Sequence, residues 1–342
     1  MNSKERVLKA FERKIPDRVP HFELLIDSQV INSLVPNGDL YDFVEIIGLD
    51  AIVVRPTFEK RKMEDNLYVD EKGQMILKGK TQDYFELQNR VIKNKKDLDK
   101  FEFPDPYSEI RLQNLRKAVE RFKDKKAIVI FLREGWAEAR DLHGFEETLI
   151  DLIDNPSLIK GIIEKSVDYY SELGRISAEI GADIALSGDD ISGINGMFMS
   201  PYHFKELIYP AMKRLYKNWR KYGLYIMKHS DGNLNPIMEL LIDTGFDCLH
   251  PIDPLAGMSL KEVKSKWGDK ICIMGNVNCA GNLVFGSKKD VVSEVKRCID
   301  IAAPGGGYIC SSSNSIPRGV KPENYKVMVE TIKSYGKYNN IK

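Results

Sequence analysis

Two histidines with carboxylates close by end apolar segments in the second half of the chain. His229 and Asp231 end the segment LYIMKHSDG, which begins at Leu224, and His250 lies in FDCLHPIDP, which begins at Phe246. Imidazole and carboxylate groups bind metal ions such as zinc, and both also serve as general acids and bases. A single histidine at a strand end is more often structural, so a prediction of chemistry requires several such ends to meet.

Residues able to bind a metal or a substrate also end four other apolar segments, which begin at Ala127, Ala182, Lys270 and Gly306. They are Glu134, Trp136, Asp189, Asp190, Asn276, Cys310 and Asn314. Each has an ordinary structural explanation, because an aspartate often caps a turn and a free cysteine is commonly a small buried residue. The hypothesis of an active site therefore depends on the fold that brings these ends together.

Apolar segments alternate with helical patterns along almost the whole chain. Eight segments are strand candidates, and they begin at Val19, Asp50, Ala127, Ala182, Leu224, Phe246, Lys270 and Gly306. Strands that alternate with helices indicate parallel strands joined by right-handed crossovers, so eight of them predict an α/β fold of the (β/α)8 TIM-barrel type. In such barrels the active site lies at the C-terminal ends of the strands.

One segment breaks this alternation. Residues 61–90 alternate polar and apolar positions around the sequence EKG, which predicts an antiparallel β-hairpin inserted after the second strand. We find neither a linker-like stretch nor a repeat, so we expect a single domain over residues 1–342.

Composition excludes several classes of protein. The 342 residues carry a formal charge of +1, which gives no electrostatic footprint for nucleic acid. No apolar stretch approaches the ~20 residues that span a bilayer, and the N-terminus lacks the apolar core of a signal peptide. The five cysteines form no CxxC pair and are odd in number, which indicates free thiols in a reducing compartment. We therefore expect a cytoplasmic protein that binds neither membranes nor nucleic acids.

The C-terminal half carries a family resemblance. The stretch from His229 through GNVN at 275–278, the later GGGYICSSSNSI and the final PENYKVMVETIKSYG together resemble the uroporphyrinogen decarboxylase superfamily. The first half is similar mainly in its layout. True uroporphyrinogen decarboxylases carry an arginine-rich stretch after the first strand and an essential aspartate after the second. Here these places read PHFELLIDSQVINSL and VVRPTF, so decarboxylation of a porphyrinogen is not expected.

The other branch of this superfamily consists of methyltransferases that serve corrinoid proteins or coenzyme M. In that branch an H-x-C motif and a cysteine near the eighth strand hold a zinc ion. The motif reads His229-Ser230-Asp231 in this chain, and either Cys310 or Asn314 takes the place of the later cysteine. The resemblance implies a metal site of His229, Asp231 and Cys310, with His250 as a further ligand or as an acid. Imidazole and carboxylate are harder ligands than thiolate and leave a metal more Lewis acidic, which suits the polarisation of an ether oxygen.

We therefore expect a methyltransferase that moves a methyl group from a small methylated substrate, such as an O-methyl ether, to cob(I)alamin. The resulting methylcobalamin would lie on a separate corrinoid protein, because the chain has no DxHxxG motif of its own. His229, Asp231 and His250 are the expected catalytic residues. The expected substrate-binding residues are Glu134, Trp136, Asp189, Asn276 and Asn314.

Two alternatives remain open at this point. The first is a metal-independent decarboxylase or lyase for a smaller carboxylic acid, for which Arg55 and Arg133 are the candidate cationic clamp. The second is a barrel that binds a ligand without catalysis. A homodimer and a monomer are equally compatible with the sequence.

Overall fold

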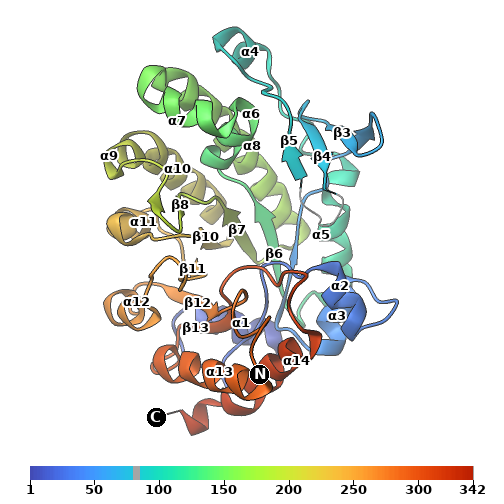
Figure 1. Cartoon of the computed structure of the whole chain (residues 1–342), viewed down its shortest axis with the longest axis vertical. Helices are drawn as coiled ribbons and strands as arrows, with labels where there is room; N and C mark the ends of the chain where they lie inside the picture. Colours follow the sequence, from blue (N-terminus) through green and yellow to red (C-terminus); the bar gives the residue numbers. More distant parts are fainter. Residues whose placement is uncertain (80–84, 342) are drawn as a thin grey trace.

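The computed structural model describes residues 1–79 and 85–341. Seven parallel strands form its central sheet, in the order β1-β6-β7-β10-β11-β12-β13 (Figure 1). They are β1 (Ala51–Val54), β6 (Ala127–Leu132), β7 (Ile184–Gly188), β10 (Tyr225–His229), β11 (Cys248–His250), β12 (Cys272–Val277) and β13 (Tyr308–Ser312). Each coincides with a predicted apolar segment, so seven of the eight predicted strands are confirmed. The sheet is a parallel half-barrel.

The first predicted strand, which begins at Val19, is not a regular strand. Pro20 accepts a hydrogen bond from the Cys310 amide and His21 accepts one from the Asp50 amide, so this segment lies between the two edges of the sheet. Beyond that point it forms only an isolated bridge between Ile26 and Ile316. The expectation of eight regular strands is therefore corrected to seven strands and one extended segment.

The pleat of the strands separates two hydrophobic layers. The inner face gathers residues from all seven strands, for example Val53, Leu186, Met227 and Ile309, so the sheet must curl around them. Alternate residues point outward and pack against helices, as Ile226 and Cys310 do. The direction of a side chain at a strand end therefore decides whether it faces the mouth of the half-barrel or the helices.

Helices cover the outer face of the sheet (Figure 1). Along the chain they are α1 (Ser3–Phe11), α2 (Ser28–Leu34), α3 (Leu40–Ile47), α4 (Lys95–Lys100), α5 (Glu109–Phe122), α6 (Gly135–His143), α7 (Phe145–Asp154), α8 (Pro156–Ile180), α9 (Pro201–His203), α10 (Tyr209–Arg220), α11 (Met238–Asp243), α12 (Leu260–Trp267), α13 (Lys288–Ala302) and α14 (Pro322–Tyr335). A π-helical turn at 204–208 joins α9 to α10, and single 3-10 turns lie at 235–237 and 338–340.

Helix α1 covers the end of the half-barrel opposite the strand C-termini. Its residues Val7, Ala10 and Phe11 join the inner hydrophobic layer, and Phe11 packs edge-on against Tyr225 at the start of β10. An Asn2 capping box begins the helix. None of the helices in the described part of the chain is long and apolar enough to cross a membrane.

The insertion after β1 is larger than the predicted hairpin. Strands β3 (Leu67–Asp70) and β4 (Met75–Lys78) are antiparallel and connected by the predicted EKG turn. Strands β2 (Lys60–Lys62) and β5 (Phe85–Leu87) extend this hairpin to a four-stranded sheet. Residues 80–84, which belong to the predicted hairpin, lie outside the described residues. A small ribbon of β8 (Ser192–Gly193) and β9 (Gly196–Met197) follows β7.

Candidate functional site

Asp190, His229 and Asp231 form a cluster at the mouth of the half-barrel. His229 Nε2 lies 3.6 Å from Asp190 Oδ1 and 3.8 Å from Asp231 Oδ1. One potential ligand atom from each residue lies within 4.8 Å of the other two. The cluster arises because β10 ends at His229 and the loop after the adjacent β7 brings Asp190 alongside; the Asp231 amide donates to Asp190 Oδ1 at 3.0 Å.

His250 joins this cluster through the second histidine nitrogen. His229 Nδ1 and His250 Nδ1 are 2.8 Å apart, so one of these nitrogens donates a proton to the other. If His229 donates, its Nε2 has a free lone pair that faces the two aspartates. If His250 donates, His229 Nε2 carries a proton toward them. The predicted catalytic residues His229, Asp231 and His250 are thus brought together.

Both imidazoles are neutral near pH 7 in the protein alone. Burial lowers the pKa of His229 to about 4, although the charge of Asp190 opposes the effect, and the positive charges of Lys228 and Arg55 add to it. Burial also lowers the pKa of His250 well below its usual value. Neutral imidazole is the form that binds metal ions.

Asp231 is held by the loops around it. Asn314 donates a hydrogen bond from Nδ2 to Asp231 Oδ2. Burial, with the nearby charges of Asp190 and Asp253, raises the pKa of Asp231 to about 7. Its Oδ1, which is buried and faces His229, has no hydrogen-bond partner in the described residues. A buried carboxylate oxygen without a partner is costly, and a cation at this place would satisfy it.

The residues of this cluster fit a metal ion of the zinc type. One imidazole nitrogen and two carboxylate oxygens converge, and these are ligands that zinc accepts at catalytic sites. In the metal-binding tautomer His229 Nδ1 donates to His250 Nδ1, and this hydrogen bond would orient the ring of His229, as outer partners of metal-bound histidines commonly do. This candidate ligand set differs from the one expected from the sequence, because it includes Asp190 and does not include Cys310.

Cys310 points away from the mouth. Ile309 belongs to the inner layer, so the pleat directs Cys310 outward, where Cys298 of α13 belongs to the same hydrophobic layer. Burial raises the pKa of the Cys310 thiol well above its usual value, which keeps it protonated. Between the two strand-eight candidates, Asn314 is the one that contacts the cluster.

Glu134 and Asp189 lie behind the strands, between the sheet and its helices. Glu134 accepts hydrogen bonds from Tyr216 and from Lys228 Nζ, the latter at 3.3 Å. Lys228 Nζ also donates to the Asp189 carbonyl at 2.9 Å, and all of these side chains are buried. The Asp189 carboxylate accepts a hydrogen bond from the Ala137 amide at the start of α6. These two predicted substrate-binding residues thus belong to a buried polar network.

Trp136 and Asn276 are also buried and engaged. Trp136 Nε1 donates to the Asp190 carbonyl at 2.9 Å, so the indole supports the loop that carries Asp190. Asn276 Nδ2 donates to the Ile252 carbonyl at 2.9 Å, and its Oδ1 faces the Cys298 thiol on α13. Trp136 and Asp189 thus contact the cluster through its backbone, whereas Asn314 donates a hydrogen bond to one of its carboxylates.

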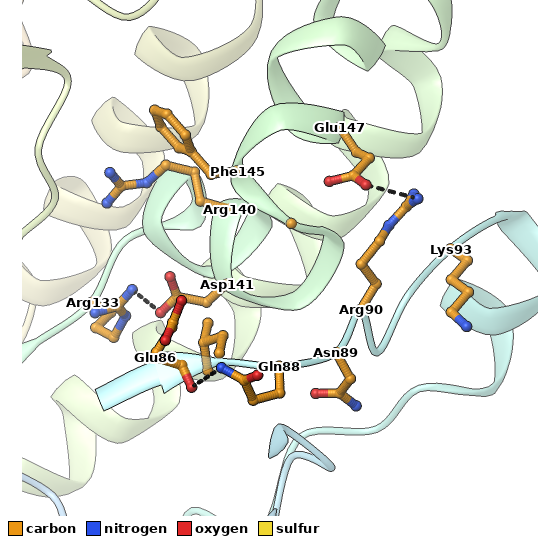
Figure 2. Close-up of a pocket in the computed structure, with 12 residues that line it drawn as sticks. Glu86, Gln88, Asn89, Arg90, Lys93, Arg133, Arg140, Asp141, Phe145 and Glu147 are labelled. Atoms are coloured by element: carbon orange, nitrogen blue, oxygen red, sulfur yellow. Dashed lines mark hydrogen bonds and ion pairs between the residues drawn. The ribbon is translucent and has the colours of Figure 1, made fainter. Parts of the chain in front are cut away.

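Three cavities open around the half-barrel, and their lining residues do not include Asp190, His229 or Asp231. One cavity of about 520 Å³ lies under the inserted sheet, and its lining includes Arg55, Phe58, Lys72, Phe131 and Arg133. A second, of about 530 Å³, opens where the extended first segment separates from β1, and it also reaches Arg55. A third, of about 810 Å³, lies between β5 and helices α6 and α7. Figure 2 shows Arg133 pointing toward Asp141 in this last cavity, and Arg90 toward Glu147.

Asp190 and Arg55 were not among the residues predicted to bind a metal or to act in catalysis, although both lie at the mouth of the half-barrel. The alternation of inward and outward residues along their strands indicates this position for both. Ile184 and Leu186 face inward on β7, so Gly188 and then Asp190 fall on the same face, whereas Asp189 does not. Ala51 and Val53 face inward on β1, so Arg55 follows them into the mouth. Alternation by two residues distinguishes such neighbours only when the inner face of the strand is known.

Comparisons with known proteins identify the family. Uroporphyrinogen decarboxylase from Psychromonas ingrahamii is 23% identical over 258 residues, which cover 71% of this chain and 69% of the relative. The enzyme of the same name from Actinobacillus pleuropneumoniae is 20% identical over 266 residues, covering 72% of this chain and 71% of the relative. A methyltransferase from Methanosarcina mazei shares the fold, with a TM-score of 0.77 and 20% identity over 98% of this chain and 99% of that one. The family profile described as Uroporphyrinogen decarboxylase (URO-D) matches residues 75–335, and the chain therefore belongs to the uroporphyrinogen decarboxylase family.

Proposed function

We propose that this protein is a methyltransferase that transfers a methyl group from a small methyl ether to the cobalt of a separate corrinoid protein. The observation that carries the proposal is the convergence of His229 Nε2 with Asp190 and Asp231 at 3.6 and 3.8 Å. The fold shared with the Methanosarcina mazei methyltransferase agrees with it. Because that likeness concerns the fold alone, the chemistry is argued from the cluster.

The residues at the mouth do not suit a porphyrinogen. Residues 21–35, at the extended first segment and just after it, contain no arginine that could bind the carboxylates of a porphyrinogen. Arg55 follows β1, where the true decarboxylases have the aspartate. Arg133, the other arginine considered as a clamp, is already paired with Asp141 and Glu138. Decarboxylation of a small acid thus has only Arg55 in its favour.

In the proposed reaction, cob(I)alamin supplies the electron pair that forms the cobalt–carbon bond. The carbon–oxygen bond of the ether breaks, and the departing oxygen retains its electron pair and then takes a proton. A metal ion held by Asp190, His229 and Asp231 would supply Lewis acidity at that oxygen. His229 and His250 share one proton between their Nδ1 atoms, which fixes the orientation of the His229 ring. Without a metal, the protonated Nε2 of His229 is the donor to the oxygen.

Exposed apolar side chains at the rim of the mouth favour the docking of a protein partner. Large apolar side chains are exposed on the loops and helices that follow the strands, and loops at this end surround the active site in barrels of this type. They are Phe145, Ile194, Tyr202, Leu255 and Phe285, the last with 80% of its surface exposed. We propose that the corrinoid protein docks on this rim, which would bring its cobalt to the ether.

Elemental analysis of protein purified without added metal tests the proposal. We expect about one zinc per chain in the natural protein and its loss in His229→Ala, because three protein ligands are the usual minimum at a catalytic zinc. His203→Ala, which changes a half-buried histidine on α9 outside the cluster, should keep its zinc. The natural protein should methylate free cob(I)alamin with 2-methoxyethanol or methoxyacetate as the donor, and the absorbance of the corrinoid measures the reaction. His229→Ala should also lose this activity.

Full methylation activity in His229→Ala would disprove the assignment of this site. Protein that takes up no zinc even when zinc is supplied, and methylates no cobalt, would favour the decarboxylase or the non-catalytic binding barrel instead. Those two differ in whether a bound carboxylic acid is recovered unchanged.

A further inference from the structure

Arg55 places a guanidinium group at the mouth of the half-barrel. It follows β1 directly, remains accessible to solvent and forms no ion pair with any described residue. Its guanidinium lies over the ring of Phe131, 4.1 Å from the ring centroid. Stacking on an aromatic ring leaves the edge of the guanidinium, with its N–H donors, free for a planar anion.

The other basic residues around the first cavity are already engaged. Lys72 Nζ pairs with Glu138 at 3.0 Å, and Arg133 pairs with Asp141. Lys60 also lines this cavity, beside its strand partner Asp70. Arg55 is thus the cation that these carboxylates do not neutralise. Partial desolvation by the cavity walls and the positive charge of Arg133 lower the pKa of Arg55 to about 10, an effect that a bound anion would relieve.

The position of Arg55 is tied to the cluster through Phe131. A Cβ atom at Gly188 would lie 2.1 Å from Phe131 Cζ, so the ring occupies the space that a side chain at this position would fill. Gly188 is the strand partner of His229. The sequence of contacts therefore runs from Arg55 to Phe131, across Gly188, to the strand end that carries His229.

The surroundings of Arg55 define the ligand class. The cavity of about 520 Å³ has apolar walls that include Phe58, Ile76 and Phe131, and its arginines and lysines outnumber its two carboxylates, Asp70 and Asp141. A cavity of this size accommodates a small organic molecule. We infer that Arg55 binds the carboxylate of a small organic acid with an apolar body, which places the rest of that molecule toward the His229 cluster. This inference rests on the proposed function only in naming the bound acid as the methyl donor.

Binding of small carboxylates measured by calorimetry tests the inference. Benzoate and methoxyacetate are the anionic probes, and benzyl alcohol and 2-methoxyethanol are their neutral counterparts. Arg55→Gln should weaken binding of the two anions by about tenfold or more, because it removes a charged hydrogen-bond donor, and leave the neutral probes unaffected. Arg55→Lys should retain part of the affinity, since it keeps the charge and loses the planar fork.

Arg90→Gln is the matched control. Arg90 lines the neighbouring cavity but is already paired with Glu147, so its loss should change benzoate binding less than twofold. Equal binding of the anions by natural protein and Arg55→Gln would overturn the inference. Failure of the natural protein to bind either carboxylate would overturn it as well.

The two proposals can fail separately. Arg55 is not among the three candidate metal ligands, so we expect Arg55→Gln to contain as much zinc as the natural protein. If benzoate binding depends on Arg55 but the protein contains no zinc and methylates no cobalt, the anion site stands and the proposed methyltransferase activity is wrong. If 2-methoxyethanol is a better methyl donor than methoxyacetate and Arg55→Gln does not change this, the methyltransferase proposal stands and the anion site is wrong.

Discussion

Glu23 is a carboxyl group that the fold keeps protonated at neutral pH. It lies on the extended first segment, is 4% exposed and accepts hydrogen bonds from the amide and hydroxyl of Ser312. Burial raises its pKa to about 8, although the Ser312 hydrogen bonds oppose the rise. A raised folded-state pKa gives stability that is present below the unfolded pKa and is lost as the pH rises through the folded one.

We therefore expect the free energy of unfolding to fall between about pH 5 and pH 9 by roughly 2–5 kcal/mol through this group. Glu23→Gln removes the ionisable proton and keeps the shape, so its stability should depend less on pH over the same interval. Urea denaturation of both proteins at pH 5, 7 and 9 measures the difference. Parallel curves for the two proteins would show that Glu23 is ionised in the fold.

At the scale of elements, β7 determines how closely its neighbours approach the site. Gly188 has no Cβ, and the Phe131 ring from β6 fills the space beside it. Gly188→Ala should displace this ring and with it the support of Arg55. We expect weaker binding of benzoate, with zinc content and secondary structure retained.

Calorimetry with benzoate, together with circular dichroism, measures both outcomes. Gly193→Ala, in the short strand β8, is the control, because a Cβ there meets Phe198 only at 3.3 Å. Unchanged benzoate binding in Gly188→Ala would show that Arg55 does not depend on the position of Phe131.

Strands could be predicted from the sequence where apolar segments are bounded by turn residues. They could not be predicted where an apolar segment forms few backbone hydrogen bonds, or where a strand contains no apolar residue. The segment from Val19 has a strand-like composition, but Pro20 has no amide to donate and Ile26 pairs with Ile316 instead of β1. The outer strands of the insertion were not recognised because β2 is the exposed sequence KRK, which has no apolar alternation. Among the predicted site residues, His229, His250, Asp231 and Asn314 lie together as their strand ends suggested, whereas Cys310 and Asp189 point toward the helices.

At the scale of the whole molecule, Asp50 joins three parts of the N-terminal half beneath the sheet. Its carboxylate accepts hydrogen bonds from Arg6 of α1 at 2.7 Å, from Arg18 at 2.8 Å and from the His21 amide at 2.9 Å. Asp50 is fully buried, and the arginines lower its pKa although burial opposes them. Removal of its charge leaves two arginines without their shared partner.

Asp50→Asn should lower the free energy of unfolding by about 3–5 kcal/mol, the usual cost of breaking a buried ion pair. Asp17→Asn is the control, because Asp17 binds the same Arg6 but its side chain is 44% exposed. We expect that change to cost less than about 1 kcal/mol. Denaturant unfolding compares the variants, and equal losses would show that burial of Asp50 does not determine its contribution.

The outward direction of Cys310 has a consequence for the environments in which the protein can work. All five cysteines are buried, and the ligand atoms of the Asp190–His229–Asp231 cluster are nitrogen and oxygen. Metal sites built on thiolates lose their metal when oxidants convert sulfur to sulfenic acid or disulfide. Carboxylate and imidazole ligands do not undergo that reaction. A metal held by this cluster would therefore survive contact with peroxide or air that empties a thiolate site of the same family.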